Sequence, residues 1–267
     1  MPFFRYFALL ALLLTPSVSA SEDKTSKHIT FACSESTDSP LFSMLQIVFS
    51  YYFDSQGYSF SMQTTTEQRM ISEVSSGRID GSCGQNIPMF EALNDSRLLR
   101  TTTPIADLSV RALSRKQSTT VQSLEDLLDP TLRIGIIAST GTALAAKDLG
   151  IKYSNILNID RGARMLAANR LDYVVSNHLQ IMRAVNDLGS QTPMQVSDSL
   201  FHLSVHPIFN RVHLPFIPSM NLYLAQLNQC LGGPLSQVTS RQWFNLSKHT
   251  IAGCIDRKRP AVMAPEP

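Results

Sequence analysis

The sequence predicts an α/β protein built from two similar lobes. One pattern occurs twice: an extended apolar stretch, a short helix containing Arg-Met, and an Arg-apolar-Asp triplet that leads into another extended stretch. The copies occupy residues 58–80 and 155–172. They lie about 90 residues apart, well beyond the roughly 20 to 50 residues of a stacked repeat, and therefore indicate two lobes instead of a solenoid. A chain folded in this way usually works in the crevice between its lobes.

The composition and charge of the chain indicate its broad class and the kinds of partner it can have. Hydrophobic residues make up 43% of the 267-residue chain and charged residues 16%, which is typical of a globular protein. The 23 basic and 21 acidic residues leave a net charge of +2, and the basic residues are scattered apart from Arg257-Lys258-Arg259. This distribution argues against a nucleic-acid partner.

Residues 1–20 have the pattern of a signal peptide. Arg5 precedes an apolar run over residues 7–14, and Val18-Ser19-Ala20 places small residues at the cleavage site. A membrane anchor is the alternative, but the run is shorter than the roughly 20 residues that a span needs. We therefore expect a mature chain that begins at residue 21, is exported to the periplasm and is not embedded in the membrane.

Four cysteines in an exported chain usually form disulfides. Three pairings are possible, and the most economical joins Cys33 to Cys83, on the first and third predicted strands, and Cys230 to Cys254, which both lie near the C-terminus. Buried free thiols are an alternative. A redox-active pair is less favoured because the chain has no Cys-x-x-Cys.

The elements of the first unit follow from apolar stretches and helix caps. Residues 29–33 form the first strand, and Ser39-Pro40 is a capping residue followed by proline that starts a helix ending before Gly57. Next come a strand over 58–62, a helix over 67–75, a strand over 79–83, a loop or short helix over 86–96, and an extended crossing segment over 100–116.

The second unit begins with a capping signal at Ser123 and one or two helical turns. Residues 132–137 have the continuous apolar content of a strand covered on both faces. A turn over 139–142 leads into a helix over 143–149; after the second copy of the pattern come a helix over 178–188, a returning strand over 201–206, helices over 220–231 and 235–244, and a disordered tail over 256–267.

Several short motifs follow one another in a fixed order. They are Gly77-Arg78-Ile79-Asp80, Thr101-Thr102-Thr103-Pro104, Ser123-Leu124-Glu125-Asp126-Leu127, Leu132-Arg133-Ile134-Gly135, Ser139-Thr140-Gly141-Thr142, Asn169-Arg170-Leu171-Asp172 and Arg241-Gln242-Trp243-Phe244. Each is weak alone, but over nearly all of the mature chain their order and spacing resemble the family 3 periplasmic solute-binding proteins of the polar amino acid type. That family has the type II periplasmic binding protein fold.

The resemblance implies an architecture and a function. Lobe one would comprise residues 21–106 plus 201–255 and lobe two residues 107–200, with a hinge of two crossing strands near 105–108 and 199–203. The protein would be a monomer without cofactor or metal that captures a small polar molecule between its lobes for an ABC importer, with the permease as its partner. A sensor module of the same fold is the alternative, and a dehydratase-like enzyme is less favoured.

The sequence departs from the family at the expected ligand site. Amino-acid-binding members usually carry an Arg after the third strand to hold the α-carboxylate, but residues 85–91 contain none. Arg97 or Arg100 could substitute, or both could be solvated. The Asp that usually receives the α-ammonium aligns with Asn177. These losses argue against an ordinary α-amino acid as the ligand.

The residues expected at the cleft are polar and mostly neutral, and they follow the carboxyl ends of strands, where open α/β sheets bind ligands. We expect ligand contacts from Glu35, Gln85 and Asn86 on lobe one and from Ser139, Thr140, Thr142 and Asn177 on lobe two. An ordinary helix cap is the alternative role for the turn over 139–142.

Two other pairs of residues could suggest a metal or catalytic site, but neither pair predicts one. His202 and His206 lie on one face of a strand, some 13 Å apart, which is too far to share a metal ion, so both are expected to face solvent. Asp80 and Asp172 occupy the same position in the two copies of the pattern, which indicates a role in the fold and not a catalytic dyad.

Overall fold

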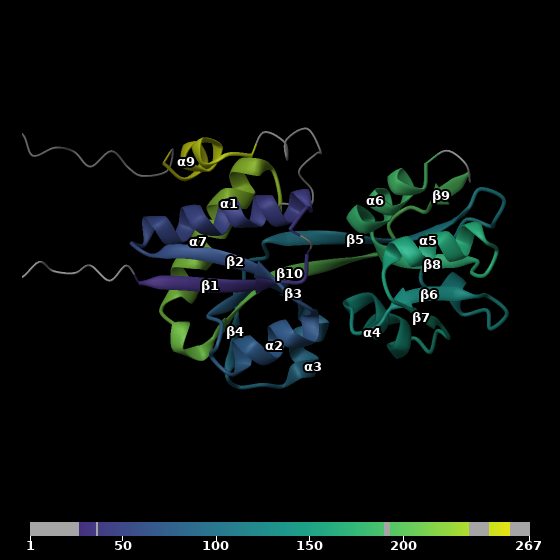
Figure 1. Cartoon of the computed structure of the whole chain (residues 1–267), viewed down its shortest axis with the longest axis horizontal. Helices are drawn as coiled ribbons and strands as arrows, with labels where there is room; N and C mark the ends of the chain where they lie inside the picture. The colour runs from purple at the N-terminus through teal and green to yellow at the C-terminus, as the bar shows by residue number, and fades with distance from the viewer. Residues whose placement is uncertain (1–26, 36, 190–192, 235–245, 257–267) are drawn as a thin grey trace, which may run out of the picture.

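The computed structural model describes residues 27–35, 37–189, 193–234 and 246–256. These residues form two α/β lobes that share one sheet (Figure 1). Its strands run in the order β2-β1-β3-β10-β5-β8-β6-β7, with β4 paired to β10 and β9 paired to β5. The predicted signal peptide, the predicted helix over 235–244 and residues 257–267 of the predicted tail lie outside the described residues.

The first lobe carries helices on both faces of its part of the sheet. Helices α1, α7 and α9 share the core cluster on one face, and α2 and α3 share the cluster on the other. Its elements are β1 (His28–Cys33), α1 (Pro40–Ser55), β2 (Ser59–Thr64), α2 (Glu67–Ser75), β3 (Gly81–Asn86), α3 (Ile87–Leu93), β4 (Leu98–Arg100), η3 (Arg211–His213), α7 (Phe216–Leu231) and α9 (Lys248–Asp256).

The second lobe repeats this layered plan with fewer elements. Helix α4 packs on one face of its strands, and α5 and α6 pack on the other. Its elements are η1 (Glu125–Leu127), β6 (Ile134–Ile137), α4 (Gly141–Asp148), β7 (Ser154–Ile156), α5 (Ile159–Ala167), β8 (Tyr173–Asn177), α6 (His178–Leu188) and β9 (Met194–Val196).

Two long antiparallel strands connect the lobes, β5 (Ala106–Arg115) and β10 (Phe201–Asn210). Their paired register extends from Ala106 opposite Val205 to Val110 opposite Phe201. The crossing segment expected from the sequence is therefore a strand. The predicted lobe limits stay predictions, since both strands continue through the junction.

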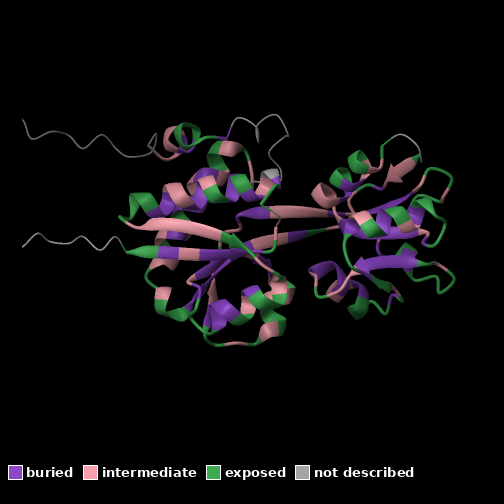
Figure 2. Ribbon diagram, in the orientation of Figure 1, coloured by how far each residue is buried: buried purple, intermediate pink, exposed green. Residues whose placement is uncertain are grey.

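The core of the first lobe is centred on Phe31, which has no exposed surface. Its ring makes edge contacts with four other phenylalanine rings at centroid distances of 5.0–5.4 Å: Phe49, Phe53, Phe60 and Phe209. Figure 2 shows buried residues along most of the strands and exposed residues on the outer helix faces, whereas β2 at the end of the sheet has only intermediate and exposed residues. Such close packing makes each lobe a firm support for the residues between them.

Both expected disulfides are present. Cys33–Cys83 joins the neighbouring strands β1 and β3, and Cys230–Cys254 joins α7 to α9. In β1 and β3 the ladder pairs Phe31 with Gly81 and Ala32 with Ser82, so the two cysteines come next in register. The most economical pairing predicted from the sequence is confirmed.

The third strand begins two residues later than predicted, at Gly81, and runs on to Asn86. The reason lies in Asp80, whose carboxylate accepts a hydrogen bond from the backbone N–H of Thr30 at 2.8 Å. At the start of this strand pair, the N–H of Thr30 therefore bonds to the Asp80 side chain and not to a backbone carbonyl oxygen. At the other end of this strand, Gln85 and Asn86 pair with β10 and so belong to the strand and not to a loop.

The expectation that His206 faces solvent is wrong. Its side chain is buried, and Nδ1 donates a hydrogen bond to the carbonyl oxygen of Thr101 at 3.0 Å. Strand β10 extends to Asn210, beyond the predicted 201–206, and lies between β3 and β5 at the middle of the sheet. A central strand covered on both faces buries its polar residues too. His202, nearer the junction, is exposed as expected.

Candidate functional site

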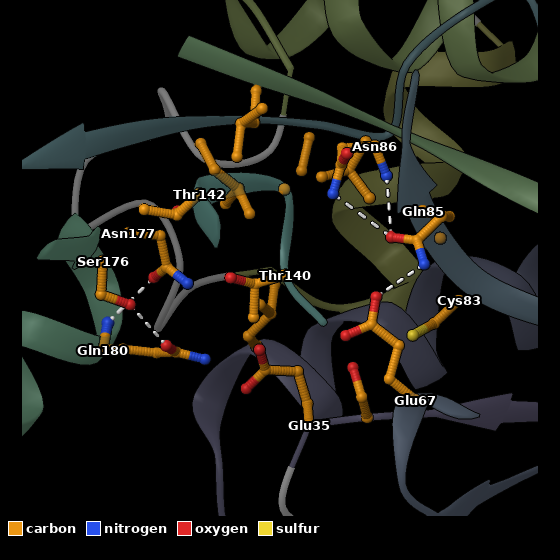
Figure 3. A pocket seen from close by; sticks show the side chains of 18 of the residues that line it. Glu35, Glu67, Cys83, Gln85, Asn86, Thr140, Thr142, Ser176, Asn177 and Gln180 are labelled. Carbon is orange, nitrogen blue, oxygen red and sulfur yellow. Dashed lines mark hydrogen bonds between the residues drawn. The ribbon is translucent and has the colours of Figure 1, made fainter. Parts of the chain in front are cut away.

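A cavity of about 140 Å³ lies between the lobes at the carboxyl ends of β1, β3, β6 and β8 (Figure 3). This is the edge at which open α/β sheets bind ligands. Both lobes and both connecting strands contribute to its wall. The described residues that line it are Ser34, Glu35, Leu41, Leu45, Glu67, Cys83, Gly84, Gln85, Asn86, Ile105, Ala106, Leu108, Ile137, Thr140, Gly141, Thr142, Val175, Ser176, Asn177, Gln180, Leu203 and Val205.

Three of the lining residues are helix caps. Asn86 caps α3 by accepting from the N–H of Met89 at 3.0 Å, and Asn177 caps α6 in the same way from Gln180 at 3.0 Å. Thr140 caps α4, with its hydroxyl accepting from Ala143 at 3.2 Å. Each cap follows a strand directly or by a short turn, so the starts of three helices lie around the cavity. The turn over 139–142 therefore does cap a helix, which was the alternative role expected for it. This role does not exclude a ligand contact.

A chain of hydrogen bonds forms the lobe-one wall. The Gln85 side-chain NH₂ donates to the Glu67 carboxylate at 2.6 Å, and its carbonyl oxygen accepts from the Asn86 backbone and side chain at 3.1 and 3.3 Å. Burial raises the pKa of Glu67, and the hydrogen bond from Gln85 offsets only part of that rise. The second Glu67 oxygen points toward the middle of the cavity in Figure 3.

Glu35 places a second carboxylate at the cavity, on the segment after β1. Burial raises its pKa, opposed by the guanidinium of Arg183 on α6 and by a hydrogen bond with Ser39. Arg183 itself lies outside the lining and is 3.8 Å from Asp160. Arg183 belongs to the second lobe and Glu35 to the first, so a charge on one lobe lowers the pKa of a carboxyl group on the other.

The lobe-two wall presents amide groups with their oxygens already engaged. The Asn177 side-chain oxygen accepts from the Gln180 backbone, and the Gln180 side-chain oxygen accepts from the Ser176 hydroxyl at 2.8 Å. The NH₂ groups of both amides remain toward the cavity in Figure 3. Thr142, on the first turn of α4, is buried beside them.

The lobes touch at the cavity through Gly141 and Asn86. A Cβ atom placed on Gly141 would lie 2.6 Å from the side-chain nitrogen of Asn86, closer than real Cβ atoms approach other groups. Asn86 cannot easily withdraw, since it caps α3 and bonds to Gln85. Glycine at position 141 is thus required by the close approach of the two lobes.

Six of the seven residues expected at the cleft line this cavity: Glu35, Gln85, Asn86, Thr140, Thr142 and Asn177. Ser139 does not; it is exposed and has a left-handed φ of 58° at the turn before α4. Neither alternative arginine reaches the cavity. Arg97 binds Asp95 at 2.8 Å, and Arg100 donates to the carbonyl of Thr101 and lies over the ring of Phe90.

Sequence reasoning missed Glu67 and Gln180. Glu67 is the first residue of α2, where an acidic residue is ordinarily explained by the helix dipole. Gln180 lies three residues after the cap of α6 and looks like a surface residue of an amphipathic helix. A signal was available for both: each belongs to the first turn of a helix that follows a strand ending at the cleft.

The described residues contain no helix long and apolar enough to cross a membrane. Nor do they bring together three or more His, Cys, Asp or Glu side chains in a way that could hold a metal ion.

Comparisons with known proteins identify the fold. No family model and no curated protein matches the sequence. Among solved structures, a putative binding component of an ABC transporter from Wolinella succinogenes in complex with lysine is similar, with a TM-score of 0.63 at 15% identity over 76% of this chain and 90% of that one. The GluR0 ligand-binding core from Nostoc punctiforme in complex with L-glutamate has a TM-score of 0.60 at 12% identity, over 86% and 98%.

A histidine kinase sensor domain with similarity to periplasmic binding proteins is a third similar structure, with a TM-score of 0.62 at 14% identity over 82% of this chain and 94% of that one. At such low identity these likenesses concern the fold alone. They confirm the type II periplasmic binding protein fold expected from the sequence.

Proposed function

We propose that this chain, which has the type II periplasmic binding protein fold, is an exported solute-binding protein that closes its lobes over a small polar molecule. The observation that carries this proposal is the inter-lobe cavity, whose wall takes polar groups from both lobes. A ligand that bonds to Asn86 on one side and to Thr142 on the other gains its full binding energy only when the lobes close. Closure also removes water, which strengthens those bonds.

Delivery to an ABC permease in the periplasm is the favoured setting. The export pattern of residues 1–20 and the likeness to an ABC transporter component support it. A sensor module is the second candidate, favoured by the likeness to a histidine kinase sensor domain. Both settings use the same cavity, so the test of ligand binding serves either one. A catalytic role on this scaffold is the least favoured, and turnover of a bound molecule would establish it.

The experiment is native mass spectrometry of the mature protein purified from the periplasm, combined with a thermal-shift screen of small metabolites. A molecule that binds only the folded chain raises the melting temperature. We expect a retained or screened ligand whose affinity falls about five- to 150-fold in Thr142→Ala, as loss of one buried hydrogen bond predicts. Thr120→Ala, at an exposed position outside the cavity, is the matched control and should bind normally. A ligand that binds Thr142→Ala as well as wild type would contradict the proposed site.

A further inference from the structure

The two walls of the cavity have opposite polar character. On lobe one the charged groups are the carboxylates of Glu35 and Glu67, while none of the described lining residues is Lys or Arg. On lobe two the amides of Asn177 and Gln180 have their oxygens bonded and leave N–H donors. One wall therefore accepts hydrogen bonds and carries negative charge, and the other wall donates hydrogen bonds and carries no full charge.

Carboxylates held in a closed cavity need a positive partner. Taking an ionised carboxyl group out of water costs several kcal/mol unless a cation compensates it. Arg183, whose charge acts on Glu35, lies outside the lining and is also 3.8 Å from Asp160. For Glu67 the recorded partner is the neutral Gln85 amide. Without a cationic ligand, closure of the lobes favours the protonated, neutral form of both carboxyl groups, whereas a ligand cation stabilises their ionised form.

The N-termini of the helices at the cavity do not offset the charge of the carboxylates. A helix N-terminus carries about half a positive charge, and its first N–H groups can bond to a neutral carbonyl as well as to an anion. In α4 and α6 the caps Thr140 and Asn177 already satisfy one N–H each. The carboxylates of Glu35 and Glu67, once ionised against a cationic ligand, outweigh these partial charges.

The volume limits the size of the ligand. A cavity of about 140 Å³ compares with the roughly 150 Å³ of an engineered cavity that holds benzene. A molecule of roughly six to eight non-hydrogen atoms therefore fills this volume.

We infer that the ligand of this cavity is a small organic cation without a carboxylate, whose ammonium or guanidinium end lies against Glu35 and Glu67 and whose other end offers a neutral acceptor, such as a carbonyl, to the amides of lobe two. The inference rests on the proposed function and adds the chemical class of the solute. It also predicts which end of the molecule each lobe holds.

A set of four probes of equal length tests both ends at once. 4-Aminobutanamide has an ammonium head and an amide tail; pentanamide replaces the head by a methyl group; 4-aminobutanoate replaces the tail by a carboxylate; pentanoate changes both. Calorimetric titration of the mature protein should show 4-aminobutanamide binding about tenfold to 100-fold more tightly than pentanamide, as expected for a hydrogen bond to a charged group. It should also bind more tightly than 4-aminobutanoate.

The variant Glu67→Gln tests whether the preference for an ammonium group comes from the lobe-one wall. It keeps the acceptor for Gln85 but removes the charge, so the advantage of 4-aminobutanamide over pentanamide should shrink about tenfold or more. Glu125→Gln, at an exposed position outside the cavity, should leave that advantage unchanged. Circular dichroism of both variants checks that they fold.

The outcomes separate the two proposals. Tighter binding of pentanamide or pentanoate overturns the inference but keeps the cavity as a solute site. An ammonium preference that persists in Glu67→Gln also overturns it. If none of the four probes binds at millimolar concentration, the inference falls, while the proposed function is still decided by the metabolite screen described above.

Discussion

At the scale of single residues, Asp80 and Asp172 play the same part in the two lobes. Each carboxylate accepts a backbone N–H from the neighbouring parallel strand, Asp80 from Thr30 and Asp172 from Arg133, both at 2.8 Å. The N–H of each Asp in turn donates to the carbonyl of the same partner residue. The expectation that they belong to the fold and not to a catalytic pair agrees with these contacts, which give the repeated Arg-apolar-Asp triplet a physical reason.

Asp172→Ala should destabilise the second lobe. The Arg133 guanidinium holds the pKa of Asp172 below its ordinary value, so the carboxylate stabilises the fold above the ordinary pKa, and this contribution is lost as the pH falls through the lowered value. We expect the free energy of unfolding at pH 7 to fall by about 1–3 kcal/mol, measured by urea denaturation, and the loss to shrink in acid. Asp148→Ala, at an exposed position, is the control; equal effects of both variants would refute the assignment.

Glu67→Gln should stabilise the ligand-free protein. Since burial raises the pKa of Glu67, the group favours folding while it is protonated, and this contribution is lost as the pH rises through the raised value. The variant cannot ionise and still accepts from Gln85. We expect its melting temperature to exceed that of wild type by about 2–4 °C near pH 8 and by less near pH 4. A lower melting temperature at both pH values would show that Glu67 is a stabilising residue and not one kept for binding.

At the scale of elements, the two disulfides have different positions relative to the site. Cys33–Cys83 ties β1 to β3 at the strand ends that line the cavity, with Cys83 in the wall. Cys230–Cys254 fixes α9 to α7, away from the lining. The first supports the geometry of the site, and the second holds the last described helix to the first lobe.

Mature protein should therefore contain no free thiols. Peptide mapping should join Cys33 with Cys83 and Cys230 with Cys254, and the double variant Cys230→Ala/Cys254→Ala should lose about 2–4 kcal/mol of unfolding free energy, as expected for a loop of this length. Because this bridge is away from the cavity, ligand affinity at 20 °C should hardly change in that variant. Alkylation of all four cysteines without reductant would disprove the pairing.

At the scale of the whole molecule, the lobes meet closely enough that one methyl group matters. Gly141→Ala would place Cβ against the amide of Asn86, so we expect ligand affinity to fall about five- to 150-fold, as overpacking of 1–3 kcal/mol predicts. Small-angle scattering should show less compaction on ligand addition than in wild type. Gly253→Ala on α9, where a Cβ meets nothing within 4 Å, is the matched control. Normal affinity and compaction in Gly141→Ala would show that the lobes do not close at this contact.

The charge of the cavity as a whole also excludes a class of ligands. An α-amino acid brings a carboxylate, and none of the described lining residues is an Arg or Lys that could hold it. Burying that carboxylate without a cation costs several kcal/mol. We therefore expect none of the twenty standard amino acids to bind with micromolar affinity in calorimetry, including the lysine and glutamate bound by similar structures. A micromolar dissociation constant for any of them would overturn this expectation.

The sequence by itself predicted most of the elements and their order, and it favoured the cysteine pairing that the structure has, although it gave no sign of β9 or α9. Helices α2 and α6 begin and end at the predicted residues, because capping residues and apolar spacing act over a few residues and are visible along the chain. The repeated triplet indicated equivalent positions in two lobes for the same reason. Most of the cavity wall could also be predicted, since strand ends in a known order meet at one edge of the sheet.

Only the tertiary structure decided the character of the site. It placed Glu67 in the wall, kept Arg97 and Arg100 out of it, buried His206 in the middle of the sheet and brought Gly141 against Asn86. Each of these outcomes depends on how elements far apart in the sequence pack together and which side chain faces which neighbour. Local propensity carries no information about such contacts, so the charged groups of the cavity, from which we infer the class of ligand, come together only when the lobes are assembled.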